Sequence, residues 1–266
     1  MPDTAFDPFD PFDPFASAAV ITMARQGRMP RPLDLPAALR PREAVEAYAV
    51  QDLVVRERGE IAGWKVGAAS PQAAPARAAL TRDSVWVAAA DGAVHLSTAG
   101  FAVLGVEAEW IYGLRADLPP RATPYSPAEV LAAVGSVRAG IEVCDTRYAA
   151  WGQQNEWSRL ADQACHGALI VGSGTEEVAA LDAMAQSVVL TINGAVASHP
   201  AGWNNPAGDP LRLLIWLANG GAHSLGGLQA GQWVTTGSCT GTILVAPGTT
   251  VVAEFPGLGR AELKLS

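Results

Sequence analysis

The sequence has few cysteines, few charged residues and no long apolar run. Its three cysteines, Cys144, Cys165 and Cys239, are far apart in the chain of 266 residues and odd in number. This argues against a disulfide framework or a cysteine-rich zinc site and favours a reducing, cytoplasmic location. No apolar stretch reaches the roughly 18 residues of a membrane span, so we expect no membrane association.

Basic residues are also scarce. Lys and Arg number 18 against 26 Asp and Glu, which gives a formal net charge of −8 at pH 7. No basic run stands out, so nucleic acid is not an expected partner. Hydrophobic residues make up 49% of the chain. This is enough for a large core in one domain, or in one domain with a small N-terminal lobe.

The first residues read MPDTAFDPFDPFDPF and repeat Phe-Asp-Pro three times. Proline removes backbone hydrogen-bond donors and the aspartates repel one another. We therefore expect residues 1–35 to form a disordered or loosely docked tail. This acidic, proline-rich start does not resemble a signal peptide. A role in docking a partner is left open.

Two helices have clear sequence signals. Residues 36–58 follow a helical period that Gly59 can end. A second helix is expected to begin after Ser126, because Pro127 suits the first helical position and Glu129 completes a capping box. We expect this helix to run through SPAEVLAAVGSVRAG. A further short helix is expected after Asp209-Pro210.

Strands account for most of the remaining chain. Asp91-Gly92 and Asn193-Gly194 predict tight hairpin turns, and residues 71–82, rich in Ala and Pro, predict a loop. Strand-like segments are 61–70, 84–89, 93–97, 101–114, 141–148, 166–174, 187–198, 232–238, 240–246, 249–255 and 259–266. Since these strands are not joined by regular helices, they predict a mixed α+β fold rather than a doubly wound sheet.

Two glutamates, Glu107 and Glu109, interrupt the apolar run FAVLGVEAEWIYGL. On a strand they share one face, and the other face, which carries Trp110, is wholly apolar. Neighbouring carboxylates repel each other unless a cation compensates them, and Mg²⁺ prefers oxygen ligands. Taken alone, however, Glu-x-Glu is more often a solvated strand face.

Two more residues strengthen the cation hypothesis. Glu142 is a third acid in an apolar strand, where it shares a face with Gly140 and Cys144. Lys65 lies between hydrophobic residues and glycines, and a half-buried lysine needs an anionic partner or a catalytic task. Both a structural ion pair with a glutamate and an active-site role fit Lys65.

Six segments occur in the order and spacing that resemble the 2-keto-4-pentenoate hydratase family. They are GWKVGAAS, VEAEW, IEVCDTRYAAW, LADQACHGALIVG, GDPLRLLIWLAN and LQAGQWVTTGSCTG. This family includes 4-oxalocrotonate decarboxylases and belongs to the fumarylacetoacetate hydrolase-like superfamily. The resemblance covers roughly residues 38–266. It implies a mixed β roll or barrel with flanking helices, formed by a small helical lobe at 36–70 and a catalytic β domain at 71–266.

The resemblance also implies an activity. Glu107, Glu109 and Glu142 would hold Mg²⁺ or Mn²⁺, and Lys65 would be the active-site lysine, which either binds the substrate carboxylate or transfers a proton. The expected reaction is the addition of water to a 2-hydroxy-2,4-dienoate through a metal-stabilised enolate. Decarboxylation of a 2-oxo-enedioate is the alternative. Acylpyruvate C–C hydrolysis and an inactive metal-binding homologue rank lower. The resemblance further implies a cytoplasmic homo-oligomer that acts in aromatic catabolism.

Other positions that match family segments are expected to contact the small 2-oxo acid substrate. These are Asp162, Gln163, Ser238 and Thr240. The family usually reads ADNAS where this chain reads ADQAC, so Gln163 and Cys165 depart from the pattern. His166, which follows directly, fits either a proton shuttle or a structural role. No activating base can be identified for Cys165 as a nucleophile.

Overall fold

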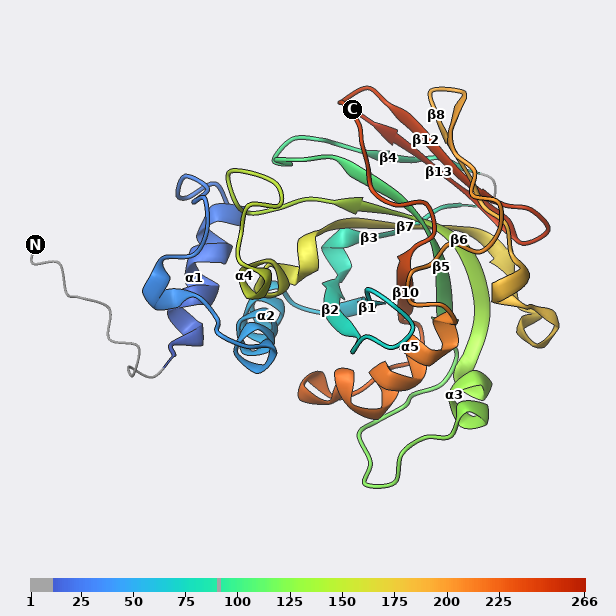
Figure 1. Ribbon diagram of the computed structural model, residues 1–266, viewed down its shortest axis with the longest axis horizontal. Coiled ribbons are helices and arrows are strands. Elements are labelled where there is room, and N and C mark those ends of the chain that lie inside the picture. The colour runs from blue at the N-terminus through green and yellow to red at the C-terminus, as the bar shows by residue number, and fades with distance from the viewer. Residues whose placement is uncertain (1–11, 90–91) are drawn as a thin grey trace, which may run out of the picture.

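The computed structural model describes residues 12–89 and 92–266, which form two β-sheets with flanking helices (Figure 1). The α helices are α1 (Pro14–Arg25), α2 (Ala44–Arg58), α3 (Pro127–Ala133), α4 (Glu156–Ala161) and α5 (Pro210–Trp216). The strands are β1 (Ile61–Gly67), β2 (Ala76–Thr81), β3 (Val85–Val87), β4 (Val94–Leu96), β5 (Gly105–Leu114), β6 (Val134–Cys144), β7 (His166–Thr175), β8 (Val189–Ile192), β9 (Ala195–Ser198), β10 (Trp233–Ser238), β11 (Ile243–Leu244), β12 (Thr250–Phe255) and β13 (Gly259–Leu265).

The larger sheet is mixed and curls into a half-barrel. Its strand order is β2-β1-β10-β5-β6-β7-β3, with β11 paired to β5. The pairs β1–β10 and β3–β7 are parallel, and the other pairs are antiparallel. The α+β fold class predicted from the sequence is confirmed.

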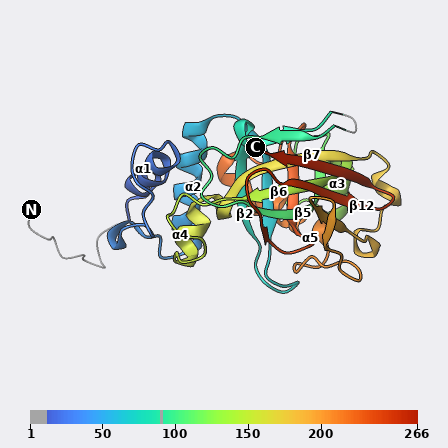
Figure 2. The same cartoon turned by 90° about the horizontal axis from the view of Figure 1, so that it is seen from above.

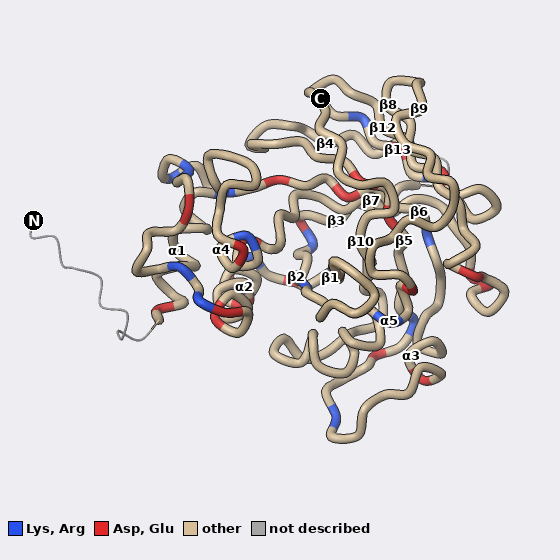
Figure 3. The backbone as a smooth tube through the Cα atoms, in the orientation of Figure 1, with Lys and Arg blue, Asp and Glu red and all other residues tan. Residues whose placement is uncertain are grey.

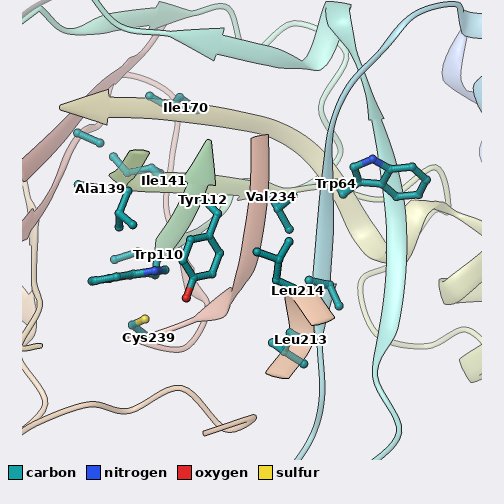
Figure 4. Close-up of a cluster of buried hydrophobic side chains, with 14 of the residues drawn as sticks. Trp64, Trp110, Tyr112, Ala139, Ile141, Ile170, Leu213, Leu214, Val234 and Cys239 are labelled. Carbon is teal, nitrogen blue, oxygen red and sulfur yellow. The ribbon is translucent and has the colours of Figure 1, made fainter. Parts of the chain in front are cut away.

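The outer face of this sheet carries the main core. On β5 the alternate residues Val106, Ala108, Trp110 and Tyr112 are at most 4% exposed. Figure 4 shows Trp110 and Tyr112 near other buried side chains of the sheet and of α5. Burial of such side chains contributes roughly 1.5–3 kcal/mol each. The apolar half of the 101–114 alternation is therefore the core half, as expected.

The inner face of the curled sheet is divided between two kinds of side chain. A small apolar cluster fills one part of it, and polar side chains of the same strands occupy the rest. The cluster consists of Ala62, Leu80, Val85, Ile111, Leu169 and Val171. Since Ile111 lies on the same face of β5 as Glu107 and Glu109, the acids point toward the inside of the half-barrel.

The second sheet, in the order β4-β13-β12-β8-β9, packs against the outer face of β6 and β7 (Figures 1 and 2). The contact between β13 and β7 is so close that a Cβ at Gly172 would lie 2.2 Å from the carbonyl oxygen of Arg260. Glycine is thus required on β7 at this point. The predicted hairpin at Asn193-Gly194 is confirmed, since it joins the antiparallel strands β8 and β9 with both residues at positive φ.

The N-terminal region corrects one expectation. Residues 1–35 were expected to be a tail, but Pro14–Arg25 is helix α1, and residues 1–11 of the Phe-Asp-Pro segment lie outside the described residues. The helix begins because Asp13 accepts hydrogen bonds from two amides of its first turn and Pro14 suits its first position. Its buried residue Ile21 belongs to an apolar cluster with residues of α2 and α4. The three helices lie close together in Figure 1.

Three other expectations about elements were wrong. The helix after Ser126 ends at Ala133, and the chain continues from Val134 as β6. In this strand Gly135 packs so closely on Arg115 that a Cβ would lie 2.8 Å from the Arg115 side chain. Asp91 of the predicted turn Asp91-Gly92 lies outside the described residues, but the strands on either side do not pair with each other, since β3 pairs with β7 and β4 with β13. The expected loop 71–82 contains β2.

The division at residue 70 stays a prediction, and β1 and β2 pair across it. Charged residues are concentrated near α1, α2 and α4 (Figure 3). No helix in the described ranges combines the length and the apolar character that a membrane crossing requires.

Candidate metal centre

Strand register brings the predicted acids together. Glu107 of β5 lies directly opposite Glu142 of β6, and Glu109 lies opposite Gly140. Directly opposed residues on an antiparallel pair project from the same face. Lys65 reaches the same face from β1 through β10, because Thr235 pairs with both Lys65 and Ile111. Four strands thus position the three carboxylates and the lysine predicted from the sequence.

Glu142 is the centre of this arrangement. The side chain is fully buried, and its Oε1 accepts a hydrogen bond from Lys65 Nζ at 2.7 Å. His166 Nδ1 lies 2.9 Å from the same oxygen, and His166 Nε2 lies 3.1 Å from Ser84 Oγ. Since a carboxylate only accepts, we assign the imidazole proton to Nδ1. Lys65 also donates to the carbonyl oxygen of Ala164 at 3.0 Å.

The other two glutamates are held by β10 and by the segment that follows it. Glu109 Oε2 accepts hydrogen bonds from Thr235 Oγ1 and from the Gly237 amide, the latter at 2.9 Å. Glu107 Oε1 accepts from Thr242 Oγ1. The two threonines were not foreseen from the sequence, whose only signal was the run of hydroxyl residues in TTGSCTGT.

Burial and mutual charge shift the pKa values of these groups in opposite directions. Burial, and then the charge of Glu142, raise the pKa values of Glu107 and Glu109. Burial alone would raise the pKa of Glu142 as well, but the charge of Lys65 and the His166 hydrogen bond lower it to about 2. Burial lowers the pKa of His166 to about 4. The charge of Glu142 outweighs burial at Lys65 and raises its pKa.

One buried oxygen of this cluster has no hydrogen-bond partner in the part of the chain that the structure describes. Glu142 Oε2 is buried and accepts no hydrogen bond in the described residues. Ligand atoms of Glu107, Glu142 and Cys144 lie within 4.8 Å of one another. An unsatisfied buried acceptor is costly, and divalent cations favour sites of this kind. The donor set therefore fits a metal ion.

A left-handed turn supports Lys65. Gln163, Ala164 and Cys165 have φ values of 50°, 49° and 63°, which non-glycine residues rarely adopt. The turn aims the Ala164 carbonyl at Lys65. Gln163 holds the turn in place, since its Nε2 donates to the Ala79 carbonyl at 3.0 Å and its Oε1 accepts from Arg58 at 2.8 Å. Strained backbone held in this way is typical of functional sites.

Asp162 and Gln163 do not have the surroundings expected of substrate-binding residues. Asp162 is buried in an ion pair with Arg147, whose Nη2 also donates to the Asp162 carbonyl at 2.8 Å. Gln163 is equally buried and engaged with β2 and the helices. Their polar atoms make structural contacts that hold the turn in place, and contact with a substrate stays a prediction for both residues.

Ser238 and Thr240 lie beside the acids. Ser238 pairs with Glu109 across β10 and β5. Thr240 Oγ1 accepts a hydrogen bond from the Ala108 amide at 3.1 Å and donates to the Gly241 carbonyl. Both side chains are partly exposed, and contact with a substrate stays a prediction for them.

A large cavity lies elsewhere. About 770 Å³ of space between α2 and α5 is lined by residues that include Tyr48, Arg77 and Trp216. Arg77 pairs with Val66 across β2 and β1, so it lies on the face opposite Lys65. The acid that lines this cavity, Asp52, already forms an ion pair with Arg77 at 2.8 Å. The cavity therefore offers no carboxylate cluster for a cation.

Comparison with known proteins gives consistent similarities. No protein-family model matches the chain. The 4-oxalocrotonate decarboxylase of Pseudomonas sp. (strain CF600) is 34% identical over 133 residues, which is 49% of this chain and 48% of that protein. The 2-hydroxyhexa-2,4-dienoate hydratase of Comamonas testosteroni is 28% identical over 66% of both chains. The chain thus matches about half the length of the first of these curated relatives.

The structural similarity extends over almost the whole chain. A structure of 4-oxalocrotonate decarboxylase from Pseudomonas putida G7 matches with a TM-score of 0.80 and 25% identity, over 95% of this chain and 97% of that one. The fold, the inward-facing acids on β5 and β6 and these similarities point to one group of proteins. In sequence and in fold, the chain is therefore similar to the 4-oxalocrotonate decarboxylases and hydratases of the fumarylacetoacetate hydrolase-like superfamily.

Proposed function

We propose that the protein is a divalent-metal-dependent lyase acting on 2-oxo unsaturated acids. The observation that carries this proposal is the Glu142 carboxylate. Lys65 and His166 occupy one of its oxygens, and the other is buried with no hydrogen-bond partner among the described residues. The carboxylate also offers a ligand atom close to one of Glu107. A cation would satisfy this oxygen and offset the repulsion between the acids.

Glu107 and Glu142 would hold the ion, with Glu109 as the third carboxylate, and Mg²⁺ or Mn²⁺ suits these oxygens. When bound, the ion would supply Lewis acidity toward the oxo and carboxylate oxygens of the substrate. The similar P. putida G7 decarboxylase structure is a complex with calcium and acetate. That complex supports the proposed combination of a divalent cation and a small organic acid.

Lys65 has a different task. Its pKa is raised by Glu142, so the ammonium stays protonated near neutral pH. This favours binding of an anionic substrate group over proton abstraction as the role of Lys65. The same ammonium fixes Glu142 at 2.7 Å, which keeps the second oxygen of that carboxylate free for the ion.

For the reaction itself we favour decarboxylation of a 2-oxo-enedioate over the hydration expected from the sequence. Two relatives from Pseudomonas, 34% and 33% identical over about half of the chain, are 4-oxalocrotonate decarboxylases. The structure that matches nearly the full chain is also a 4-oxalocrotonate decarboxylase. In such a step the C–C bond to the departing carboxylate breaks, its electron pair enters the conjugated enolate, and the enolate then takes up a proton. Hydration of a 2-hydroxydienoate remains the second candidate, supported by the Comamonas hydratase.

Mass spectrometry of the products distinguishes these reactions. Chelator-stripped protein would be given freshly prepared 2-oxo-enedioates and 2-hydroxy-2,4-dienoates, with and without Mg²⁺ or Mn²⁺. We expect metal-dependent loss of CO₂. Metal-dependent gain of water would instead establish a hydratase, and cleavage to pyruvate an acylpyruvate hydrolase. Metal binding without turnover of any substrate would contradict the proposed activity.

His166 gives a test of how Glu142 is positioned. Without the imidazole, the Glu142 carboxylate loses one of its two hydrogen-bond donors and can rotate. We expect His166→Ala to weaken Mg²⁺ binding by about 10- to 100-fold, the usual cost of losing such a support. Calorimetric titration measures this affinity. His166→Asn, whose amide can donate from a similar position, should restore part of it, and equal affinities in all three proteins would exclude the role.

The expected homo-oligomer is likewise a proposal that rests on the family resemblance. Light scattering of the purified chain would test it.

A further inference from the structure

The metal ligands expected from the sequence were three glutamates, but the structure groups the donors differently. Ligand atoms of Glu107, Glu142 and Cys144 lie within 4.8 Å of one another. Glu109 is turned toward β10, where Thr235 and the Gly237 amide hold its Oε2. The Cys144 thiol is thus one of the three donors that converge.

The register of β5 and β6 explains this placement. Glu142 and Cys144 are two residues apart on β6 and share the inner face. Glu107 lies opposite Glu142, and Gly105 lies opposite Cys144. A Cβ at position 105 would stand 3.3 Å from the Cys144 Cβ and 2.7 Å from Thr242 Cγ2. Glycine at position 105 therefore allows Thr242 and Cys144 to pack closely against β5.

A second observation points to a ligand here. Glu142 is fully buried, and its Oε2 has no hydrogen-bond partner in the described residues. Cys144 is itself only 4% exposed and is a free cysteine. A buried carboxylate with one unsatisfied oxygen and a buried thiol thus lie close together.

We propose that Cys144 is a ligand of the metal centre and that it shifts the preference of the centre from Mg²⁺ toward a thiophilic divalent ion such as Zn²⁺ or Co²⁺. This inference rests on the proposed metal centre and specifies its chemistry. Carboxylates and water suit Mg²⁺ and Mn²⁺, whereas a thiolate selects Zn²⁺ and related ions. On binding, the S–H bond breaks, the electron pair stays on sulfur to bind the ion, and the proton leaves to solvent.

Cobalt titration tests the proposal without an activity assay. Chelator-stripped full-length protein would be titrated with Co²⁺ under reducing conditions, and the near-ultraviolet charge-transfer absorption from thiolate to cobalt would be recorded. Wild type should show this absorption and Cys144→Ser should not. The serine variant should also lose about 10- to 100-fold in Zn²⁺ affinity, with Mg²⁺ affinity changed by less than about threefold.

Cys239→Ala is the matched control. Cys239 is equally buried but lies outside the group of converging donors, so its variant should keep the absorption. Thermal unfolding of the metal-free proteins checks that each variant is folded. Co²⁺ binding by wild type without the absorption, or an absorption that persists in Cys144→Ser, would overturn the role of Cys144 and leave the carboxylate centre standing. Failure of every ion to bind would overturn both.

Discussion

Glu107→Gln is expected to abolish metal-dependent turnover while the protein stays folded. The substitution removes one ligand charge but retains the size of the side chain. Lewis-acid stabilisation is worth several kcal/mol, and each ~1.4 kcal/mol is a factor of ten in rate. We therefore expect a loss of about a thousandfold in kcat/KM with the substrate that wild type turns over. Titration calorimetry should show the loss of metal affinity in parallel.

Although Glu107→Gln should lower turnover and metal affinity, it should not lower the thermal stability of the metal-free protein. Burial and Glu142 raise the pKa of Glu107, so the folded state resists its ionisation. A carboxyl whose pKa is higher in the folded than in the unfolded state lowers the free energy of unfolding once the pH rises above its ordinary pKa of 4.5. Glutamine removes this cost. In chelator at neutral pH, Glu107→Gln should unfold at the same or a higher temperature than wild type, and a marked fall would mean that Glu107 is structural.

Asp162→Asn is expected to destabilise the protein by about 3–5 kcal/mol, the usual cost of breaking a buried ion pair. Arg147 is 2% exposed, and without the Asp162 charge its remaining acid is Asp145 at 3.7 Å. Chemical denaturation measures the free energy of unfolding. Because the Asp162 carboxylate is engaged by Arg147 and Thr146, we expect KM to change little at a temperature where the variant is folded.

A surface pair provides the control for Asp162→Asn. Glu60 pairs with Arg82 at 2.8 Å, but the two side chains are 67% and 61% exposed. Glu60→Gln should change stability by less than about 1 kcal/mol. If Asp162→Asn leaves stability intact and raises KM tenfold, the substrate-binding role expected from the sequence is the correct one.

The features predicted correctly from the sequence are those that depend on neighbouring residues in the chain: strand faces, a helix cap and a tight turn. The alternation in β5 correctly separated Trp110 from Glu107 and Glu109, because strand geometry alone assigns the faces. The capping box at Ser126 formed as expected: Glu129 accepts from the Ser126 amide at 2.8 Å. The same holds for the turn at Asn193-Gly194.

What could not be predicted depends on partners far apart in the chain. Nothing near β3 or β4 indicates that they join different sheets. The ion pair that commits Asp162 requires Arg147 to be buried beside it, which the motif ADQAC does not reveal. Glu109 could not be separated from Glu107 by sequence either, since the difference comes from Thr235 on β10.

The two halves of the site rest on different parts of the molecule. The carboxylates lie on β5 and β6, inside the larger sheet, so their amides should exchange with deuterium only through global unfolding. The Ala164 carbonyl that contacts Lys65 depends on Gln163, which is tied to α1 and α2 through Arg25 and Arg58. Fraying of the N-terminal helices should therefore loosen the lysine in sub-global openings that leave the carboxylate ladder protected.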